Sequence, residues 1–343
     1  MASISVIIAT YNRSGLLRGA LDALAQQDDP RVRVTIVVAD NASTDDTRAV
    51  YDGARSRATQ FDWLWVHEPR AGKSHALNAA LARSSGEWLA FTDDDVRPEP
   101  GWLASIARAF AETDADFVVG RILPIWQAPP PPWLTPALYG VLGVPDNGAT
   151  ASAIGPGENE HIMPIGTNMA VRRAVVDRLG GFRPDLGKLR STLRSGEDHE
   201  FYLRLLHHGC RGVYLPDARV RHLVPADRLA RGYFRRWCYQ NGRNVATLEA
   251  SYPRRTPLLL GVPRYKWRRA ATDAIGLGGA FAGRDPAARF RRSAALLWFA
   301  GYVRETWCAR AALGRSGAQD VPRDAATPGP RTVASSRFLD AGR

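Results

Sequence analysis

The chain has 343 residues, of which 45% are hydrophobic and 23% charged, and its formal net charge is +12. This composition excludes the disordered, collagen-like and disulfide-rich classes, and the length allows one large domain or two modest ones. The 3 cysteines lack metal-ligand spacing, so we expect reduced thiols in a cytosolic protein. No basic leader precedes "SVIIATYN", and no apolar run approaches the roughly 20 residues of a spanning helix, so we expect neither a signal peptide nor a transmembrane segment.

Apolar runs and helical periodicities alternate over the first 115 residues. The runs predict buried strands at 5–12, 34–43, 62–68 and 87–95. Helices are predicted at 16–27, 73–84 and 102–115. A further helix is predicted to begin after an N-cap at Ser43 or Thr44, and it would carry Asp45 and Asp46 in its first turn. Strands that alternate with helices imply an α/β fold with a doubly wound, mostly parallel sheet.

The pattern loosens after residue 96. Further strands are predicted at 116–123 and 162–173 and as a pair within 212–224, with a helix at 196–209. The segment 124–149 is rich in Pro and Gly, and we expect an irregular loop over a site. From about 226 the chain is Arg-rich and mostly helical, and beyond 314 its low hydrophobicity predicts disorder.

Polar residues follow each of the first four predicted strands. Ligands of open α/β sheets bind beyond the carboxyl ends of the strands, so these residues are expected to meet there. Backbone amides and Tyr11 would hold a base, Asp40 a ribose and Arg70 a phosphate. The four features are Thr10-Tyr11-Asn12, Asp40, Arg70-Ala71-Gly72 and Asp93-Asp94-Asp95.

Three adjacent acids, Asp93, Asp94 and Asp95, come directly after a buried strand. Adjacent carboxylates repel, and the apolar residues before them offer no compensating charge. Oxygen ligands select a hard cation, so the triplet predicts Mg²⁺ or Mn²⁺ shared with a diphosphate. The alternative interpretation is three solvated acids in a turn.

A second acid pair, Glu197-Asp198, begins the helix predicted at 196–209. One interpretation is structural, because acids at a helix N-terminus complement the helix dipole. The other is catalytic, with Glu197 capping or positioning and Asp198 acting. Both can hold at once.

The positive charge is concentrated near the C-terminus. Residues 219–315 hold 20 Lys and Arg against 5 Asp and Glu, or +15, so the rest of the chain sums to −3. Arginine pairs alternate there with aromatic residues, a pattern typical of helices on anionic membranes. It would equally suit an acceptor carried on a lipid phosphate, or helices that pack on the core. Nucleic acid is a further option, but no recognition motif supports it.

Six ordered motifs resemble the family 2 glycosyltransferases of the GT-A fold over roughly residues 3–225. They are "SVIIATYNR", "VVADNASTDDT", "EPRAGKSHALNAAL", "FTDDD", "GTNMAVRR" and "GEDHEFYLRLL". The resemblance implies a doubly wound mixed sheet of GT-A type with a C-terminal helical extension. Residues 1–120 would bind the nucleotide-sugar, and 121–225 the acceptor and the catalytic base. The extension would span 226–313, before a disordered tail at 314–343.

The resemblance also implies roles for individual residues. In this family the Asp-x-Asp element binds the nucleotide-sugar, so Asp93 would face the ribose and Asp95 the metal. Thr10, Tyr11 and Asp40 would form the nucleoside pocket, and Arg70 and Lys73 would line the donor site. Asp198 matches the general base, and such enzymes typically invert the anomeric centre. His222 matches a position that adds a third metal ligand in some related enzymes, beside Asp93 and Asp95.

The resemblance implies a metal-dependent glycosyltransferase of polysaccharide or glycolipid assembly, with a carbohydrate or lipid-linked acceptor. We expect it in the cytoplasm, peripheral on the inner face of the membrane. Two alternatives stay open. A sugar-phosphate nucleotidyltransferase shares carboxylate–metal chemistry, but "ATYNRSGLL" is a poor match to its Gly-rich loop. A non-enzymatic, basic membrane-surface adaptor would leave both acid clusters unexplained.

Overall fold

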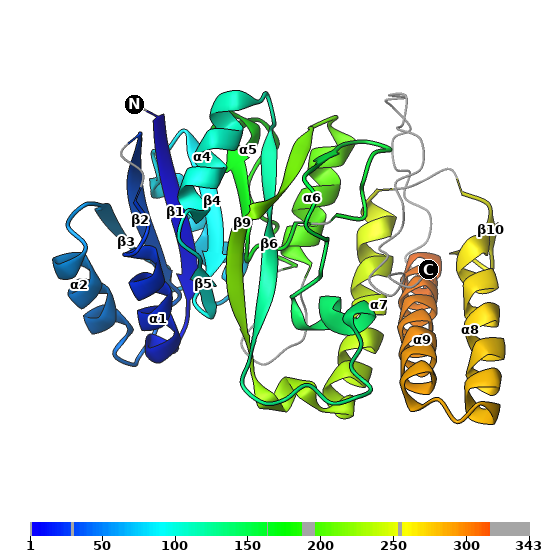
Figure 1. Cartoon of the computed structure of the whole chain (residues 1–343). Coiled ribbons are helices and arrows are strands. Elements are labelled where there is room, and N and C mark those ends of the chain that lie inside the picture. The colour runs from blue at the N-terminus through cyan, green and yellow to red at the C-terminus, as the bar shows by residue number, and fades with distance from the viewer. Residues whose placement is uncertain (1, 29–30, 163, 187–195, 253–255, 316–343) are drawn as a thin grey trace.

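The computed structural model describes residues 2–28, 31–162, 164–186, 196–252 and 256–315. Within them, a central sheet carries helices on both faces, and three long helices lie beside it (Figure 1). The predicted α/β fold with a mixed sheet and C-terminal helices is confirmed.

A 9-stranded sheet organises the described residues. Its spatial order is β3-β2-β1-β4-β8-β6-β9-β5, and β7 pairs with β9 off this path. The strands β1 to β4 are parallel to one another, whereas β8 is antiparallel to both of its neighbours. In chain order the strands are β1 (Ala2–Thr10), β2 (Val32–Asp40), β3 (Asp62–His67), β4 (Trp88–Asp93), β5 (Val96–Pro98), β6 (Phe117–Trp126), β7 (Ser152–Ile154), β8 (Met169–Arg172) and β9 (Gly212–Val224).

Helices cover the sheet on both sides because the strands are apolar on both faces. In β1, Ile4, Val6 and Ile8 join the core under one helix layer, while Ile7 joins the core under the other. The first layer is α1 (Ser14–Leu24), α2 (Thr47–Arg57) and α4 (Trp102–Glu112). The second is α3 (Lys73–Arg83), α5 (Arg173–Leu179) and α6 (Glu197–His207).

Four local predictions need correction. Of the described residues in the strand predicted at 162–173, only Met169–Arg172 form a strand, β8. The predicted pair within 212–224 is the single strand β9, whose register with β6 shifts where Leu215 gives way to Arg219. The predicted loop 124–149 is partly regular, since β6 runs to Trp126 and a 3₁₀ helix η1 spans Pro136–Leu142. The side chains of Leu138 and Leu142 in η1 are fully buried, which explains why this segment is ordered.

The start of α2 also differs from its prediction. The helix begins at Thr47, so neither Asp45 nor Asp46 lies in its first turn. Ser43 does not cap it, because the Ser43 hydroxyl accepts a hydrogen bond from the backbone N–H of Asn12 at 2.9 Å. The loop after β2 is therefore tied to the loop after β1, and both lie at the edge where ligands are expected.

The C-terminal extension is a 3₁₀ turn η2 (Ala226–Leu229) followed by α7 (Arg231–Ser251), α8 (Arg264–Ala282) and α9 (Pro286–Arg315). A short hairpin of β10 (Leu258–Leu259) and β11 (Val262–Pro263) precedes α8. Gly242 lets α7 and α9 touch, since a Cβ there would overlap the backbone carbonyl of Trp298. None of the helices in the described residues has the length and apolar character needed to cross a bilayer. The predicted tail lies outside the described residues from 316 onward.

Candidate active site

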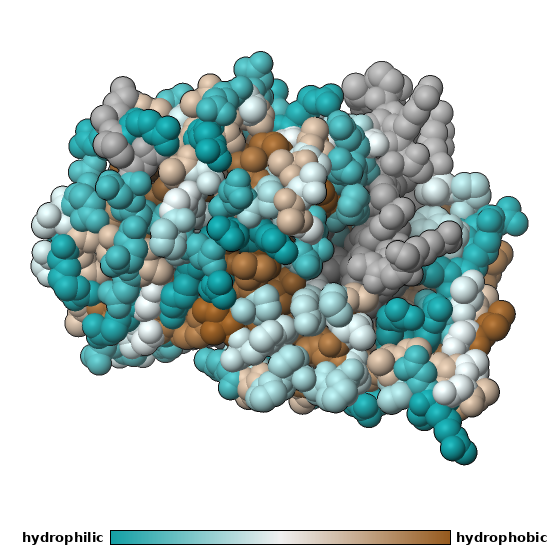
Figure 2. Space-filling view, in the orientation of Figure 1, coloured by the Kyte–Doolittle hydropathy of each residue, from teal (hydrophilic) through white to brown (hydrophobic). Residues whose placement is uncertain are grey.

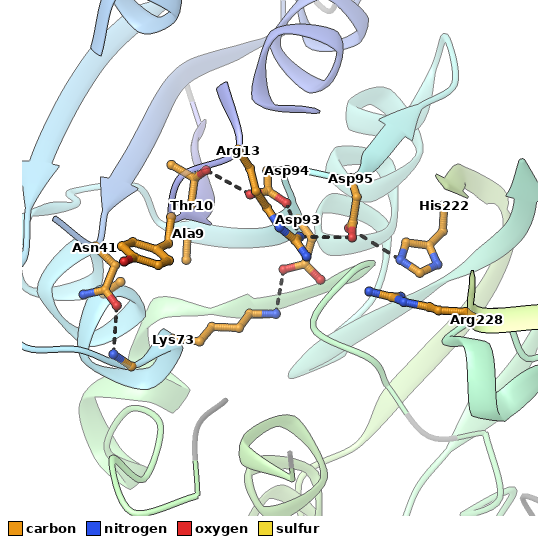
Figure 3. Close-up of a pocket in the computed structure, with 13 residues that line it drawn as sticks. Ala9, Thr10, Arg13, Asn41, Lys73, Asp93, Asp94, Asp95, His222 and Arg228 are labelled. Atoms are coloured by element: carbon orange, nitrogen blue, oxygen red, sulfur yellow. Dashed lines mark hydrogen bonds and ion pairs between the residues drawn. The ribbon is translucent and has the colours of Figure 1, made fainter. Parts of the chain in front are cut away.

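A cavity of about 250 Å³ opens at the carboxyl ends of β1, β2 and β4 (Figure 3). The register sets Thr10 beside Asp40 and Ala9 beside Asp93, so the polar residues after these strands share one edge of the sheet. Segments far apart in the sequence line the cavity, through Ala9, Thr10, Tyr11, Arg13, Asn41, Gly72, Lys73, Ala76, Asp93, Asp94, Asp95, His222 and Arg228.

Asp94 is buried and is held from two sides. Arg13 Nη1 donates a hydrogen bond to Asp94 Oδ1, and Thr10 Oγ1 donates one to Asp94 Oδ2, both at 2.9 Å. Burial raises the pKa of Asp94 to about 6, against the opposing charge of Arg13. The same Arg13 nitrogen lies 3.3 Å from Asp95 Oδ2. Arg13 thus supplies part of the compensating charge that the preceding strand lacks.

Asp95 faces an imidazole as well as the guanidinium. Its Oδ1 lies 3.4 Å from His222 Nε2, and both side chains are buried. Burial alone would raise the pKa of Asp95, but the hydrogen bond and charge of His222 and the charges of Arg13 and Arg228 outweigh it. The pKa of Asp95 therefore lies well below its ordinary value, and its carboxylate is ionised at neutral pH.

The pair Asp95 and His222 fits a divalent ion that has further ligands from a substrate. Within the described residues, no three His, Cys, Asp or Glu side chains are grouped so that they could hold a metal ion. The His222 Nδ1 atom is buried and has no hydrogen-bond partner there. Carboxylate ligands suit Mn²⁺ and Mg²⁺, and Mg²⁺ is usually held by one or two carboxylates plus substrate phosphates. The residues present therefore suit an ion shared with a diphosphate.

Asp93 turns toward a lysine. Lys73, the first residue of α3, places Nζ 2.6 Å from Asp93 Oδ1, and Thr167 Oγ1 donates to Asp93 Oδ2 at 3.0 Å. Burial disfavours the charge on Lys73, but the carboxylates of Asp93, Glu197 and Asp198 outweigh this and raise its pKa above the ordinary value. Lys73 therefore stays charged and links the aspartate triplet to the second acid pair.

Glu197 and Asp198 open α6, which begins after the left-handed Gly196 (φ +135°). Asp198 Oδ2 accepts a hydrogen bond from the backbone N–H of Gly166 at 3.1 Å. A Cβ on Gly166 would lie 3.8 Å from both Asp198 Oδ2 and Lys73 Nζ, so the acid and the amine flank the same backbone atoms. Burial and the neighbouring Asp198 raise the pKa of Glu197 to about 7. Neither Glu197 nor Asp198 lines the cavity.

Two predicted nucleoside-binding residues shape the loops beside the cavity. Asn12 adopts a left-handed conformation (φ +50°), and its Oδ1 accepts a hydrogen bond from Thr44 N at 2.7 Å. Asp40 is buried, and its Oδ1 accepts one from Ser43 N at 3.0 Å. Neither side chain lines the cavity, whereas Thr10 and Tyr11 do.

Arg70 is held away from the cavity by its own loop. Its Nε and Nη2 donate to the two carboxylate oxygens of Glu68, each at 2.8 Å. Asn41, which sequence reasoning missed, fixes this loop, since its Nδ2 donates to the Arg70 carbonyl and its Oδ1 accepts from Gly72 N. The predicted phosphate contact of Arg70 would require this bidentate pair to open.

Two arginines of the site were also missed. Arg13 directly follows the "ATYN" motif, so its place in the sequence could have indicated it. Arg228, in η2, lies in an Arg-rich region where nothing distinguishes it. Its side chain makes no hydrogen bond or ion pair within the part of the chain that the structure describes. Figure 3 shows the Arg228 guanidinium pointing toward the aspartates, where its charge acts on Asp95.

Comparisons with known proteins show which sequences and folds this chain is similar to. The model of the family described as glycosyl transferase family 2 matches residues 5–180. The succinoglycan biosynthesis protein ExoM of Rhizobium meliloti is 28% identical over 248 residues, which cover 72% of this chain and 75% of that protein.

Solved structures show the same fold. The mannosyltransferase PcManGT of Pyrobaculum calidifontis, in complex with GDP-Man and Mn²⁺, superposes with a TM-score of 0.60 at 23% identity, over 89% of this chain and 87% of that chain. Residues 1–349 of Staphylococcus aureus TarS, in complex with UDP-GlcNAc, give a TM-score of 0.51 at 17% identity, over 91% and 92%. The likeness confirms the predicted GT-A type of sheet followed by C-terminal helices.

Proposed function

The chain belongs to glycosyltransferase family 2, and on that premise we propose that it is an inverting, metal-dependent hexosyltransferase. It moves a sugar from a nucleotide-diphosphate sugar to a hydroxyl acceptor, carbohydrate or lipid-linked, in polysaccharide or glycolipid assembly. The family match (residues 5–180) decides against both alternatives, the nucleotidyltransferase and the non-enzymatic adaptor. ExoM, named for succinoglycan biosynthesis, supports a polysaccharide product.

One observation carries the proposed mechanism. The aspartate triplet and the Glu197-Asp198 pair come from distant parts of the chain, yet Lys73 connects them through its 2.6 Å contact with Asp93 and its position beside Gly166. A donor held by the triplet and an acceptor base at Asp198 would therefore meet across Lys73. Glu197 would position this end of α6 and keep the charge of Lys73 balanced.

The donor would lie in the cavity with its base against Tyr11 and Thr10, and its ribose toward Asp93. Asp95 and His222 would hold Mg²⁺ or Mn²⁺, which when bound offsets negative charge on the diphosphate. Asp94 would support this arrangement indirectly, because it anchors the Arg13 guanidinium that also contacts Asp95. Asp40 and Asn12 would contribute by fixing the loops that face the nucleoside.

Departure of the sugar leaves negative charge on the β-phosphate, and a preorganised cation can stabilise that charge without donating a proton. We assign this role to Arg228 in preference to Arg70, because Arg70 is engaged by Glu68 while Arg228 faces the cavity without a partner among the described residues. Asp198 would take the proton of the acceptor hydroxyl as it attacks from the opposite face. A single displacement of this kind inverts the anomeric carbon.

The test separates donor binding from chemistry. Asp198→Asn should abolish transfer while nucleoside-diphosphate binding with Mn²⁺, measured by calorimetry, stays within about twofold, because the base acts only on the acceptor. Asp95→Asn should weaken that binding at least about tenfold. Asp217→Asn, an exposed carboxylate on β9, is the matched control and should change neither.

A panel of nucleotide-sugars with Mn²⁺ and no acceptor would identify the donor by slow hydrolysis, and the anomeric configuration of the transferred sugar would be read by NMR. Retention of configuration, or full transfer activity in Asp198→Asn, would refute the proposed mechanism.

A further inference from the structure

The tip of the β10–β11 hairpin carries leucines that neither the turn conformation nor burial in the core explains. Leu259 pairs with Val262, so Leu260 and Gly261 form a two-residue turn, with φ of +52° and +83°. Turns with positive φ at both positions favour Asn-Gly, because a left-handed conformation costs a leucine free energy. The Leu258, Leu259 and Leu260 side chains are 54%, 50% and 63% exposed, so core burial does not explain them either.

The most exposed of the large hydrophobic side chains gather in this part of the molecule. In the described residues, every large hydrophobic side chain that stands exposed falls between 258 and 307, and the sheet domain contributes none. In Figure 2, hydrophobic atoms lie at the right-hand margin, where Figure 1 places α8, and also over the middle of the molecule. The set comprises Leu258, Leu259, Leu260, Tyr265, Ile275, Phe281 and Trp307.

Helix α8 differs from an ordinary surface helix in that charged residues lie on its buried side. Its buried side holds two charged residues, Lys266, which pairs with Glu249 at 3.2 Å, and Asp273, which pairs with Arg292. Its outward side holds Ile275, which is 78% exposed. The inward side is thus closed by ion pairs, while the outward side combines Ile275 with the exposed Arg264 and Arg268.

Basic residues border this apolar surface at the hairpin end. Arg264, Arg268, Ala271 and Ile275 follow at helical spacing and are all exposed, so they share one face of α8. The Arg310 guanidinium lies against Gly261 of the hairpin turn. The sequence has no Asp or Glu between positions 249 and 273, so no acid offsets these arginines locally.

We propose that this surface, Leu258–Leu260 with the outer face of α8, seats the protein on an anionic lipid bilayer. The leucines enter the boundary between headgroups and acyl chains, and Arg264, Arg268 and Arg310 meet headgroup phosphates. Charge favours lipid over a second copy of this chain, because a two-fold interface would set the same arginines against each other. The inference does not depend on the proposed reaction.

The full chain is sedimented with vesicles of phosphatidylcholine, with and without phosphatidylglycerol. We expect binding only with the anionic lipid, lost at high salt, and about fivefold weaker for each arginine removed in Arg264→Gln/Arg268→Gln. Arg55→Gln, an exposed arginine near the end of α2, is the matched control and should bind like the parent.

Substitutions of the leucines test the apolar part of the surface, and we expect the variants to fold because these side chains are exposed. Leu258→Ser/Leu259→Ser/Leu260→Asn should weaken binding at least about tenfold and leave donor hydrolysis unchanged. Leu260→Asn alone should weaken binding while the melting temperature stays the same or rises, because asparagine suits the turn. The proposal is overturned if the parent binds neither vesicle, if the variants bind as the parent does, or if light scattering shows a dimer that the leucine variant abolishes.

Discussion

Thr10 and Thr92 offer a matched test of how the aspartate triplet is held. Both are buried, on the neighbouring strands β1 and β4. Thr10 Oγ1 donates to Asp94 Oδ2 at 2.9 Å, whereas Thr92 Oγ1 has no hydrogen-bond partner within the described residues. Replacing each by valine keeps the shape and removes only the hydroxyl, so the two variants should differ by the value of one hydrogen bond.

The magnitude follows from the environment of Asp94. Its side chain is 4% exposed, so water cannot replace the lost donor. A hydrogen bond to a charged group contributes about 1.5–3 kcal/mol, and Thr10→Val should therefore lower the free energy of unfolding by about 2 kcal/mol. Thr92→Val removes a buried hydroxyl that is not satisfied, so it should be neutral or stabilising by up to about 1 kcal/mol.

Urea unfolding followed by tryptophan fluorescence measures both variants. The buffer is held about two pH units above the Asp94 pKa of about 6, which burial raises, so that the carboxylate is ionised. Equal losses in the two variants, or a larger loss in Thr92→Val, would show that the Thr10 hydroxyl does not hold Asp94 and would refute the reasoning.

Three further predictions concern charge, packing and pH. Arg228→Gln should weaken nucleoside-diphosphate binding about tenfold by calorimetry while Arg70→Gln changes it little; the reverse order would return the phosphate role to Arg70. Gly242→Ala should lower the melting temperature because its Cβ would overlap the backbone of α9, whereas Gly278→Ala, with nothing within 4 Å, should stabilise by about 0.5–1 kcal/mol; equal effects would contradict the close helix contact. Burial raises the pKa of Glu197 from 4.5 to about 7, so the native state binds that proton more tightly and stability falls as pH rises through this window, by on the order of 3 kcal/mol. Glu197→Gln should flatten that decline in urea unfolding, and an unchanged slope would argue against the raised pKa.

The parallel half of the sheet could be predicted because burial on both faces leaves long apolar runs in the sequence. The runs at 5–12, 34–43 and 62–68 became β1, β2 and β3, and their polar ends do meet at one edge. Apolar runs carry no information on strand direction, so the runs alone did not indicate that β8 would lie antiparallel between β4 and β6; the family resemblance implied a mixed sheet without naming this strand.

The sequence also did not indicate which strands and side chains contact one another in the fold. The strand pair predicted within 212–224 is one strand, because β9 continues through a register shift against β6 between Leu215 and Arg219. Arg70 donates to Glu68, two residues before it, and Glu68 therefore competes with any ligand for the Arg70 guanidinium. The sequence motif does not indicate this competition. Arg228 was missed because it is one of many arginines in the C-terminal region, and only the fold directs it toward the cavity.

The reversal of β8 has a consequence for any attempt to exchange parts between relatives. Because this strand runs against β4, its leading residues arrive where the parallel strands finish. Thr167 there bonds Asp93, and the preceding Gly166 bonds Asp198. Asn168 donates to carbonyls of both β6 and β9. A chimera that joined the first half of a relative to this second half would have to keep Gly166, Thr167 and Asn168 in the same register. Otherwise Asp93 and Asp198 would lose the neighbouring residues that bind them.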